Sequence, residues 1–566
     1  MAAVHVIVEG GSSSSPQHQH QQWRLTLVLA VVVPLVFLIL LARTRTRRRA
    51  KSGSSTEKGR RLLHLPPGPP TLPILGNLHQ LGALPHQSLR ELARRHGPVM
   101  LLRLGSVPTL VVSSAEAARE VMKTRDADCC SRPDTPGARR LSYGHKDVAF
   151  SPYGDYWRDM RKLFVVEFLS ARRVRAADYA REAEVDKLIG RLSLSSSAGG
   201  RPVRLEDHIF RLMDGVIGTV AFGNIYGTEQ FAHKKHFHDV LDEAMSAKAG
   251  FSAEDYYPNA AGRLLDRLTG AAARRERVFR DLDAFFDTII DQHLVNPPAS
   301  RATTPGGAGH GPDLIDVFVD LMEMEERQVD GSFRFTRDHI KGLLSNVFTA
   351  SVDTSSVTMV WAMAELIRRP AMLRKAQEEV RSVVDGGGGR ETERVHPDDV
   401  AKLRYLKAVV KETLRLHPAA PLLLPRETLR QVSICGYDVP AKTRVLVNAW
   451  AIGRDPRSWG DRPEEFDPDR FNDGGGVGFN GTHFELVPFG AGRRMCPGMG
   501  MGVATVEFTL ANLLYCFDWE LPDGVGVDDV SMQEAGGLSV HKKTPLLLVP
   551  TRYKCRSRDQ TVVSTQ

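Results

Sequence analysis

The stretch FGAGRRMCPG, from Phe489 to Gly498, is the most informative part of this chain. Its glycines permit a tight turn with left-handed backbone, and Cys496 then precedes an apolar helical pattern from Val503 to Phe517. The free amides and the dipole of a helix N-terminus stabilise negative charge, so a cysteine there is favoured as a thiolate. A lone cysteine at such a place is usually only a small buried residue. The spacing around it separates the two interpretations, and that spacing is Phe489, Gly492, Arg494, Cys496, Gly498.

Three shorter motifs contain an arginine, and in two of them the arginine shares a helix face with a second residue. KETLR contains Glu412 and Arg415, whose i,i+3 spacing puts both side chains on one helix face. WRDMR contains Trp157 and Arg161, four residues apart and so also on one face. FDPDRF supplies Arg470. Each arginine is equally compatible with a solvated surface charge, so none of these motifs identifies a site by itself.

A long helix is predicted from His339 to Arg369, because Pro370 stops it. One face carries residues that follow a 4,3,4,3,4 step: Leu343, Val347, Ala350, Thr354, Val357 and Trp361. A polar cluster interrupts that apolar face: Ser351, Asp353, Thr354 and Ser355. Polar groups inside a helix are costly unless they are satisfied. Either the Thr354 hydroxyl bonds back to the Ala350 carbonyl and bends the helix, or Asp353 and Thr354 relay protons through water.

Composition sets the broad class. The chain has 566 residues, 42% of them hydrophobic, which is enough for a large buried core. No two of its cysteines form a C-x-x-C, and no histidine pair lies near them at zinc spacing. Such usage fits reduced thiols in a cytosol-facing domain better than a disulfide framework. The six cysteines are Cys129, Cys130, Cys435, Cys496, Cys516 and Cys555.

The net charge of +8 does not indicate a basic face of a folded domain. Between Arg43 and Arg61, nine Lys or Arg residues stand against one acidic residue, Glu57, so this run carries the whole excess. The remaining chain is neutral overall. Nucleic-acid binding therefore loses its main support, and we expect no nucleic-acid partner.

The basic run follows an uncharged apolar segment of 18 residues, Leu25–Ala42. As a helix it would span about 27 Å, close to the hydrocarbon core of a bilayer. In a cleaved signal peptide the apolar core is shorter, follows the positive charges and ends in small residues. Here the charges come afterwards, so we predict an uncleaved transmembrane signal anchor. The positive-inside rule then places residues 1–24 in the lumen and the linker 43–70 in the cytosol.

Beyond the linker, which ends in the stiff LPPGPP, residues 71–554 mix short β-rich runs with longer helical ones. A hairpin is predicted over Val99–Ser114. Further helices are predicted at Glu116–Lys123, Asp155–Phe168 and Ala176–Leu192. Loops are predicted at 195–200, 297–312 and 386–389. The polar chain after Pro550 is predicted to be loose, with 555–566 as a flexible tail.

In combination these motifs resemble the cytochrome P-450 family, from about Leu65 to Lys554. The spacing around Cys496 is similar to that family's haem-binding signature, F-x-x-G-x-R-x-C-x-G. FDPDRF is similar to its P-E-R-F element, with Asp469 in place of glutamate. The proline-rich hinge and VTMVWAMAELIRRP resemble the plant microsomal group. The implied fold is mostly α with small β-sheets (α+β), a single large haem domain behind an N-terminal transmembrane helix.

The resemblance also implies roles for individual residues. Cys496 would be the axial ligand of the iron of haem b, with Phe489 close to the haem. Donors to a haem propionate would be Arg494, Trp157, Arg161 and, less securely, Arg426. Glu412, Arg415 and Arg470 would form a buried network behind the haem that serves folding and haem retention, not catalysis.

The polar cluster of the long helix is similar to the family's oxygen-activating motif, A/G-G-x-D/E-T-T/S. The departure is Ser351, which stands where glycine is usual. A side chain there narrows the oxygen groove or adds a hydroxyl to the proton relay of Asp353 and Thr354. The resemblance implies O₂ as co-substrate, with electrons from NADPH supplied by NADPH-cytochrome P-450 reductase. It also implies the endoplasmic reticulum membrane, with one span and the catalytic domain facing the cytosol.

Three segments resemble the aldoxime-metabolising members of cyanogenic glucoside synthesis: DCCSRP at Asp128, GTVAFGNIY at Gly218, and FSAEDYYPNAAGRLLDRLTG at Phe251. That similarity implies an aromatic aldoxime converted through a nitrile to a hydroxynitrile in specialised plant metabolism. The pocket would be lined by Ser142–Phe150, Ala419–Leu424 and Gly536–Ser539.

Two other hypotheses remain open. A plant monooxygenase of this kind can instead hydroxylate another small apolar metabolite, such as a terpenoid, an indole or a phenolic. A haem protein without turnover, acting as a sensor or scaffold, is the third hypothesis. The intact Asp353, Thr354 and Cys496 count against it.

Overall fold

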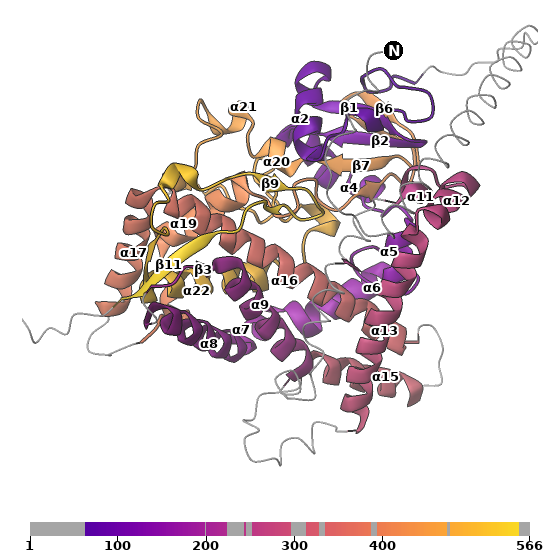
Figure 1. The fold of residues 1–566 in the computed structure, drawn as a ribbon. Coiled ribbons are helices and arrows are strands. Elements are labelled where there is room, and N and C mark those ends of the chain that lie inside the picture. The colour runs from indigo at the N-terminus through magenta and orange to yellow at the C-terminus, as the bar shows by residue number, and fades with distance from the viewer. Residues whose placement is uncertain are drawn as a thin grey trace, which may run out of the picture. The chain divides into compact units, whose positions relative to one another are not determined.

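The computed structural model describes residues 63–197, 200–223, 243–244, 252–295, 313–327, 334–386, 393–471 and 476–553. Helices dominate and the sheets are small, which confirms the predicted fold class (Figure 1). The longer helices are α2 (Pro85–His96), α6 (Asp155–Phe164), α8 (Asp178–Ser197), α9 (Leu205–Phe222), α13 (Ala271–Val295), α15 (Leu314–Arg327), α16 (Arg337–Ile367), α17 (Pro370–Asp385), α19 (Arg404–Leu416) and α22 (Met499–Cys516). The shorter ones are α3 (Ala115–Arg119), α4 (Asp126–Cys129), α5 (Pro136–Leu141), α7 (Ala171–Ala176), α11 (Ala253–Tyr256), α12 (Ala260–Leu268), α18 (Pro397–Val400), α20 (Ala449–Ile452) and α21 (Pro456–Trp459).

The largest described sheet has the strand order β1-β2-β7-β4. Its first two strands are the predicted hairpin, antiparallel with Val99 opposite Val112, and β7 adds to it in parallel. Chain segments more than 300 residues apart in sequence thus share one sheet. The strands of this sheet are β1 (Val99–Leu104), β2 (Val107–Val112), β4 (Arg426–Glu427) and β7 (Arg444–Val447). The other sheets contain β3 (Val203–Arg204), β8 (Phe517–Glu520) and β11 (Leu547–Arg552); β5 (Val432–Ile434) and β6 (Tyr437–Val439); and β9 (Glu534–Ala535) and β10 (His541–Lys542).

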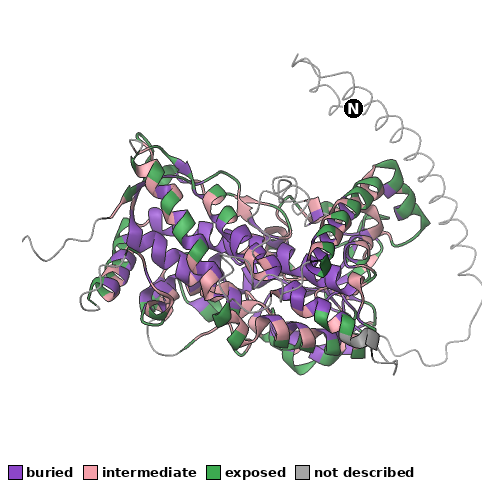
Figure 2. Ribbon diagram, turned by 90° about the horizontal axis from the view of Figure 1, so that it is seen from below, coloured by how far each residue is buried: buried purple, intermediate pink, exposed green. Residues whose placement is uncertain are grey.

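Helix α16 is the centre of the molecule and packs against α9, α19 and α22. The predicted helix is confirmed to within two residues at each end, and Pro370 begins the next helix. Most of its residues are buried, on other faces as well as the predicted one, and a less buried group near its middle contains Ala350, Ser351, Asp353 and Thr354. The predicted face is therefore only part of the buried surface of the helix, because other helices pack around it. Figure 2 shows buried residues gathered in the interior of the fold and exposed ones on its outer helices.

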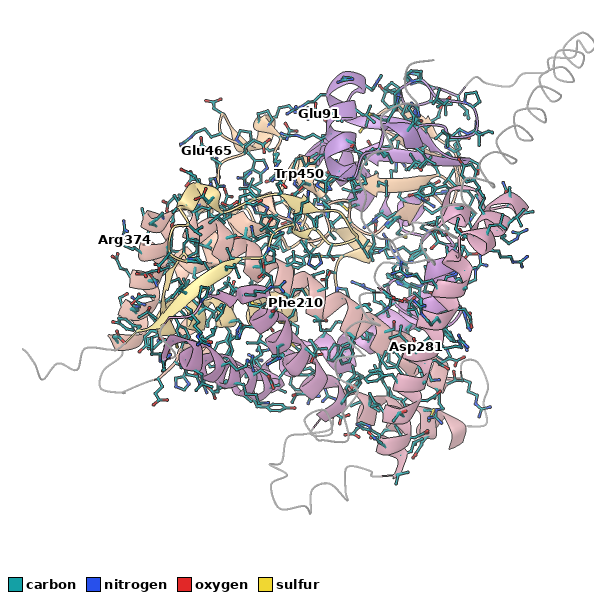
Figure 3. The ribbon with its side chains drawn as sticks, in the orientation of Figure 1. Glu91, Phe210, Asp281, Arg374, Trp450 and Glu465 are labelled. Carbon is teal, nitrogen blue, oxygen red and sulfur yellow. The ribbon has the colours of Figure 1, made fainter. Side chains whose placement is uncertain are left out.

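Side chains fill the space between the elements (Figure 3). One example is the packing of α2 against α20, where the rings of His86 and Trp450 lie 5.1 Å apart between centroids. Among the described residues, one helix, α22, is long and apolar enough to span a membrane. However, 67% of that span is buried inside the protein, as in a core helix. The predicted anchor, residues 25–42, lies outside the described residues.

Two predicted loose segments are ordered. Residues 195–197 belong to α8, because the hydroxyls of Ser195 and Ser197 bond to carbonyls one turn back. The chain after Pro550 continues in β11, where Thr551 and Arg552 pair with β8. Pairing with a distant strand is not visible in local composition. The predicted loop 386–389 begins at Gly386, which ends α17. Its other residues lie outside the described part of the chain, as do the predicted loop 297–312 and the tail 555–566.

Candidate active site

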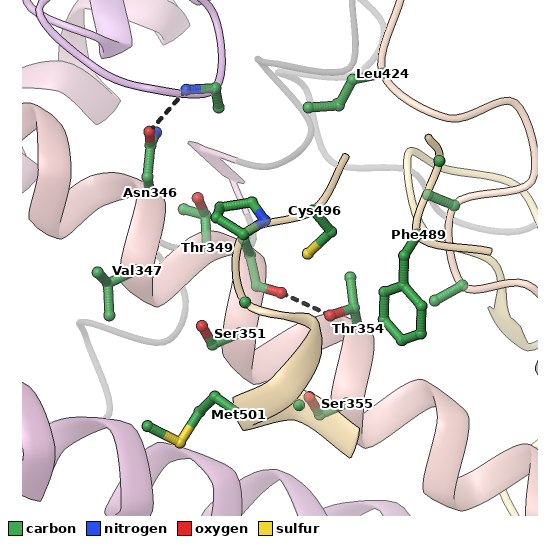
Figure 4. A pocket seen from close by; sticks show the side chains of 18 of the residues that line it. Asn346, Val347, Thr349, Ser351, Thr354, Ser355, Leu424, Phe489, Cys496 and Met501 are labelled. Atoms are coloured by element: carbon green, nitrogen blue, oxygen red, sulfur yellow. Dashed lines mark hydrogen bonds between the residues drawn. The ribbon is translucent and has the colours of Figure 1, made fainter. Parts of the chain in front are cut away.

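A large cavity lies between α16 and the loop that precedes α22 (Figure 4). About 290 Å³ of it is open to the centres of water-sized molecules. A single water needs only roughly 10–15 Å³ on this scale, so the space suits an organic group. The residues singled out from the sequence that line the cavity are Arg161, Ser351, Thr354, Arg426, Phe489, Arg494 and Cys496.

Cys496 faces this cavity from the loop before α22. Its accessible surface opens into the cavity, while the residue itself is surrounded by protein. Burial raises the pKa of the thiol, and the backbone N–H groups of Gly498 and Met499 and the charge of Arg161 act in the opposite direction. The Cys496 amide donates to the Phe489 carbonyl at 2.9 Å, which closes the loop. A sulfur in this setting is ready to bind a cation as thiolate, because a bound metal removes the cost of the charge.

The loop that carries Cys496 has no room for a side chain at Gly492. The φ angle there is +69°, and a Cβ atom would lie 2.1 Å from the Met122 carbonyl oxygen. The buried carboxylate of Asp126 holds the same turn by accepting the backbone amide of Arg493 at 2.9 Å. The glycine in the motif is thus required by the close approach of another backbone.

Four arginines line the cavity: Arg132, Arg161, Arg426 and Arg494. Burial lowers the pKa of Arg494 to about 10, and it also lowers the pKa values of Arg132 and Arg161. Asp126 and Asp147 are the buried carboxylates beside this group. Four arginines beside two carboxylates leave a net positive charge in the cavity wall, which favours an anionic ligand. Such a ligand would raise the lowered pKa values of the arginines toward their ordinary value.

The four guanidinium groups are held by backbone carbonyls. Arg426 donates to Asp126 at 2.8 Å and to the Ala491 carbonyl at 2.7 Å. Arg161 donates to the Met495 carbonyl at 2.6 Å. These bonds leave further N–H groups on each fork, because a guanidinium carries five donors.

Trp157 does not line the cavity itself but contacts two arginines that do. Its indole N–H is its sole donor, and it donates to the Val148 carbonyl at 2.9 Å. The residue is absent from the cavity lining of this structure, and its donation to a propionate stays a prediction. Its ring instead lies beneath two guanidinium groups, 4.1 Å from Arg494 and 5.5 Å from Arg161.

Glu412 and Arg415 form the buried pair that the sequence predicted. Arg415 donates from Nε and Nη2 to the two Glu412 oxygens, each at 2.7 Å, and both side chains are fully buried. The other N–H groups reach the carbonyls of Gly453, Pro463 and Glu465 at 2.6–2.8 Å. All five donors of the guanidinium therefore have partners, as a buried cation requires.

Arg470 joins this pair more loosely, with its Nε 3.4 Å from Glu412 Oε1. Asp469, the departure from the family motif, pairs with Lys375 at 2.7 Å on the surface. Neither Glu412, Arg415 nor Arg470 lines the cavity, although α19 also contributes Val410 and Leu414 to its wall.

On α16 the Thr354 hydroxyl donates to the Ala350 carbonyl at 2.7 Å (Figure 4). The back-bonded arrangement is therefore present, and α16 remains continuous around it. Thr349, Ser356 and Thr358 make the same kind of bond. Ser351 and Thr354 both line the cavity into which Cys496 faces.

Asp353 does not join them. Successive helix positions turn by about 100°, and this turn carries the carboxylate out of the cavity lining. Its Oδ1 lies 3.0 Å from Nε2 of His541 in β10, whose ring stacks on Phe210 of α9. The relay of protons by Asp353 and Thr354 through water stays a prediction, and in this structure the Asp353 carboxylate is engaged by His541.

The three predicted pocket segments each reach the cavity. They contribute Val148, Ala149, Phe150, Ala419, Ala420, Leu423, Leu424, Leu538 and Ser539. Two lining residues, Arg132 and Asn346, were not predicted from the sequence. Arg132 lies in DCCSRP, where nothing local marks its role. Asn346 is a single amide within the apolar pattern of α16, and that isolation was the available signal.

These observations fit a haem, the group that the motif implies. A cysteine sulfur faces the cavity, buried arginines supply positive charge for two propionates, and aromatic and aliphatic side chains complete the wall. Phe489 is one of these aromatic residues and packs edge-on against Phe479, 5.2 Å between centroids.

Comparison with known proteins agrees with this site. The family model "Cytochrome P450" matches residues 66–549. A protein of Sorghum bicolor, 4-hydroxyphenylacetaldehyde oxime monooxygenase, is 61% identical over 87% of this chain and 89% of its own length. A protein of Manihot esculenta, 2-methylbutanal oxime monooxygenase, is 46% identical over 87% of this chain and 92% of its own. Cytochrome P450 71B23 of Arabidopsis thaliana is 47% identical over 87% of this chain and 94% of its own length.

Solved structures agree on the fold. A zebrafish cytochrome P450 solved with abiraterone has a TM-score of 0.66 and 25% identity, covering 83% of this chain and 100% of that chain. A second zebrafish structure, solved with progesterone, has a TM-score of 0.67, and the match covers 82% of this chain and 99% of that chain.

Proposed function

The chain belongs to the cytochrome P450 family as a monooxygenase, and on that premise we propose that it converts an aromatic aldoxime through a nitrile to a hydroxynitrile. The observation that carries the proposal is the 61% identity to the sorghum oxime monooxygenase over nearly the whole globular chain. The cassava relative, also named for an aldoxime, supports it independently.

We further propose that Cys496, as thiolate, would bind the iron of haem b, and that Arg132, Arg161, Arg426 and Arg494 would hold its propionates. Thiolate-bound haem iron supplies O₂ activation, with electrons drawn from NADPH through a P-450 reductase. The residues named are those that line the cavity and carry the charge that this group needs.

The remaining residues of the cavity have two tasks. Dehydration, R–CH=N–OH to R–C≡N plus water, requires a proton at the departing hydroxyl oxygen. Hydroxylation of the nitrile requires O₂, two electrons and two protons, and it releases one water. Among the hydroxyl residues of α16 that line the cavity, Ser351 and Thr354 are the ones that we propose to hold such protons, while the aliphatic wall excludes bulk water.

Microsomes that contain this protein, its reductase and NADPH test the substrate directly. With 4-hydroxyphenylacetaldehyde oxime we expect the nitrile and then the hydroxynitrile, measured by mass spectrometry. Microsomes of the Cys496→Ser variant are the control. If no aldoxime is consumed while a terpenoid, indole or phenolic is hydroxylated, the alternative substrate class replaces this one.

Replacing Ser351 with glycine is expected to change the ratio of nitrile to hydroxynitrile several-fold, with little effect on haem content. The reason is that Ser351 adds a cavity hydroxyl one helical step from Thr354, and dehydration and hydroxylation need protons at different atoms. Ser355→Gly, on the same cavity wall, is the matched control. Equal rates of both steps in Ser351→Gly and wild type would assign the residue to packing alone.

We propose that residues 25–42 anchor the protein in the endoplasmic reticulum membrane, with the catalytic domain in the cytosol. The uncharged run and the basic residues after it support this orientation. Protease added to sealed microsomes is expected to degrade the haem domain and leave residues 1–24 protected. Protection of the haem domain would reverse the orientation.

A further inference from the structure

Residues Asp147–Phe150, here named the wall loop, form one side of the cavity through Val148, Ala149 and Phe150. Two consecutive N–H groups of this loop are held by a single side chain of α16. Asn346 Oδ1 accepts the amide of Val148 at 3.1 Å and that of Ala149 at 3.0 Å. Figure 4 shows Asn346 pointing from α16 toward the loop. Asn346 is 8% exposed and itself belongs to the cavity lining.

Asp147 fixes which way the Asn346 amide points. Asn346 Nδ2 donates to Asp147 Oδ2 at 2.9 Å, and Asp147 is fully buried. Asp147 Oδ1 in turn accepts the Phe150 amide at 3.1 Å. The opposite amide orientation would set Nδ2 against two N–H donors and Oδ1 against a carboxylate, so this network has one stable arrangement.

The carbonyl side of the wall loop faces the arginine cluster. The Val148 carbonyl accepts from Trp157 at 2.9 Å and from Arg494 at 3.3 Å. The Ala149 carbonyl accepts from Arg132 Nε at 2.9 Å. The loop is therefore bonded on both sides, between α16 and the arginines that line the cavity. Its position is determined by hydrogen bonds and not by the ligand.

We propose that Asn346 is a positioning residue for substrate: by holding the wall loop, it sets the shape of the cavity before a ligand enters and so restricts which ligands fit. A wall fixed in advance needs no ordering when the ligand binds, which raises affinity for a ligand that matches it. The choice of aldoximes as test ligands rests on the proposed function, whereas the role of Asn346 does not.

The test compares the purified holoenzyme with its Asn346→Leu variant, which has similar volume and no amide. Hydrogen exchange by mass spectrometry is expected to speed up at least tenfold in peptides covering 147–150. The dissociation constant for 4-hydroxyphenylacetaldehyde oxime is expected to rise about tenfold. The matched control is Asn512→Leu, because Asn512 is a buried amide of α22 that likewise accepts a loop amide, from Val395 at 3.0 Å, away from the cavity lining.

A reciprocal exchange separates positioning from general damage. Asn346→Asp alone sets two carboxylates face to face and is expected to loosen the wall loop. Adding Asp147→Asn restores the pair with its roles exchanged, since residue 147 then donates and residue 346 accepts. Recovery of exchange protection and of the dissociation constant in the double variant is the expected result.

The two proposals fail in different ways. If the wild type binds no aldoxime, the proposed substrate falls, and the ratio of dissociation constants for imidazole and 4-phenylimidazole replaces the aldoxime measurement. A severalfold change of that ratio in Asn346→Leu, with faster exchange at 147–150, supports positioning. Unchanged exchange, or faster exchange with unchanged ligand discrimination, overturns it.

Discussion

Replacing Cys496 with serine is expected to abolish the red-shifted absorption band of the reduced carbonyl complex and all NADPH-dependent turnover. The sulfur faces the cavity, with the Gly498 and Met499 amides and Arg161 favouring its charge. A serine hydroxyl has a far higher pKa than a thiol and cannot donate electron density as thiolate does. Difference spectroscopy of reduced, carbonyl-treated microsomes measures the band.

The control for this variant is Cys435→Ser, a half-buried cysteine of another part of the fold. It is expected to retain the band. A Cys496→Ser protein that keeps the band while Cys435→Ser loses it would contradict the assignment of the ligand.

Substituting Arg415 with lysine is expected to lower the free energy of unfolding by about 3–5 kcal/mol and to prevent accumulation of haem-loaded protein. The fully buried guanidinium uses all five donors, two of them on Glu412. An ammonium offers three donors from one point and leaves the carboxylate and several carbonyls unpaired. Haem content per polypeptide and the midpoint of thermal unfolding measure the loss.

The matched control is the exposed pair Glu91–Arg94, which has the same i,i+3 spacing on the surface of α2 (Figure 3). Its side chains are 56% and 58% exposed, so Arg94→Lys is expected to change stability by less than about 0.5 kcal/mol. Equal losses of stability in Arg415→Lys and Arg94→Lys would show that burial does not determine the contribution of the Glu412–Arg415 pair.

The Glu412–Arg415 pair and the turn that carries Cys496 could be predicted because their sequence patterns are local, whereas iron ligation by Cys496 stays a prediction. A tight turn before a helix needs glycine at a fixed distance from the cysteine, and an i,i+3 pair shares a helix face wherever the helix lies. Gly492 differs in this respect: the sequence marks the glycine, but the reason for it is a distant contact, since a Cβ there would lie 2.1 Å from the Met122 carbonyl oxygen.

The sequence did not predict contacts with other segments of the chain. The indole N–H of Trp157 donates to the Val148 carbonyl in the preceding loop, and the carboxylate of Asp353 lies beside His541, 188 positions further on. Helical spacing assigns a side chain to a face but does not say what covers that face. The wall loop was predicted to line the pocket, whereas the amide of Asn346 that holds it became visible only with α16 packed against it.

The walls of the cavity come from residues as distant in the chain as Arg132 and Ser539. During synthesis the N-terminal part of this wall leaves the ribosome long before its C-terminal counterpart. The β-pairing of Thr551 and Arg552 with β8 cannot form until both residues have emerged. A nascent chain stalled before residue 496 lacks both Cys496 and this strand, so the cavity is completed only late in synthesis.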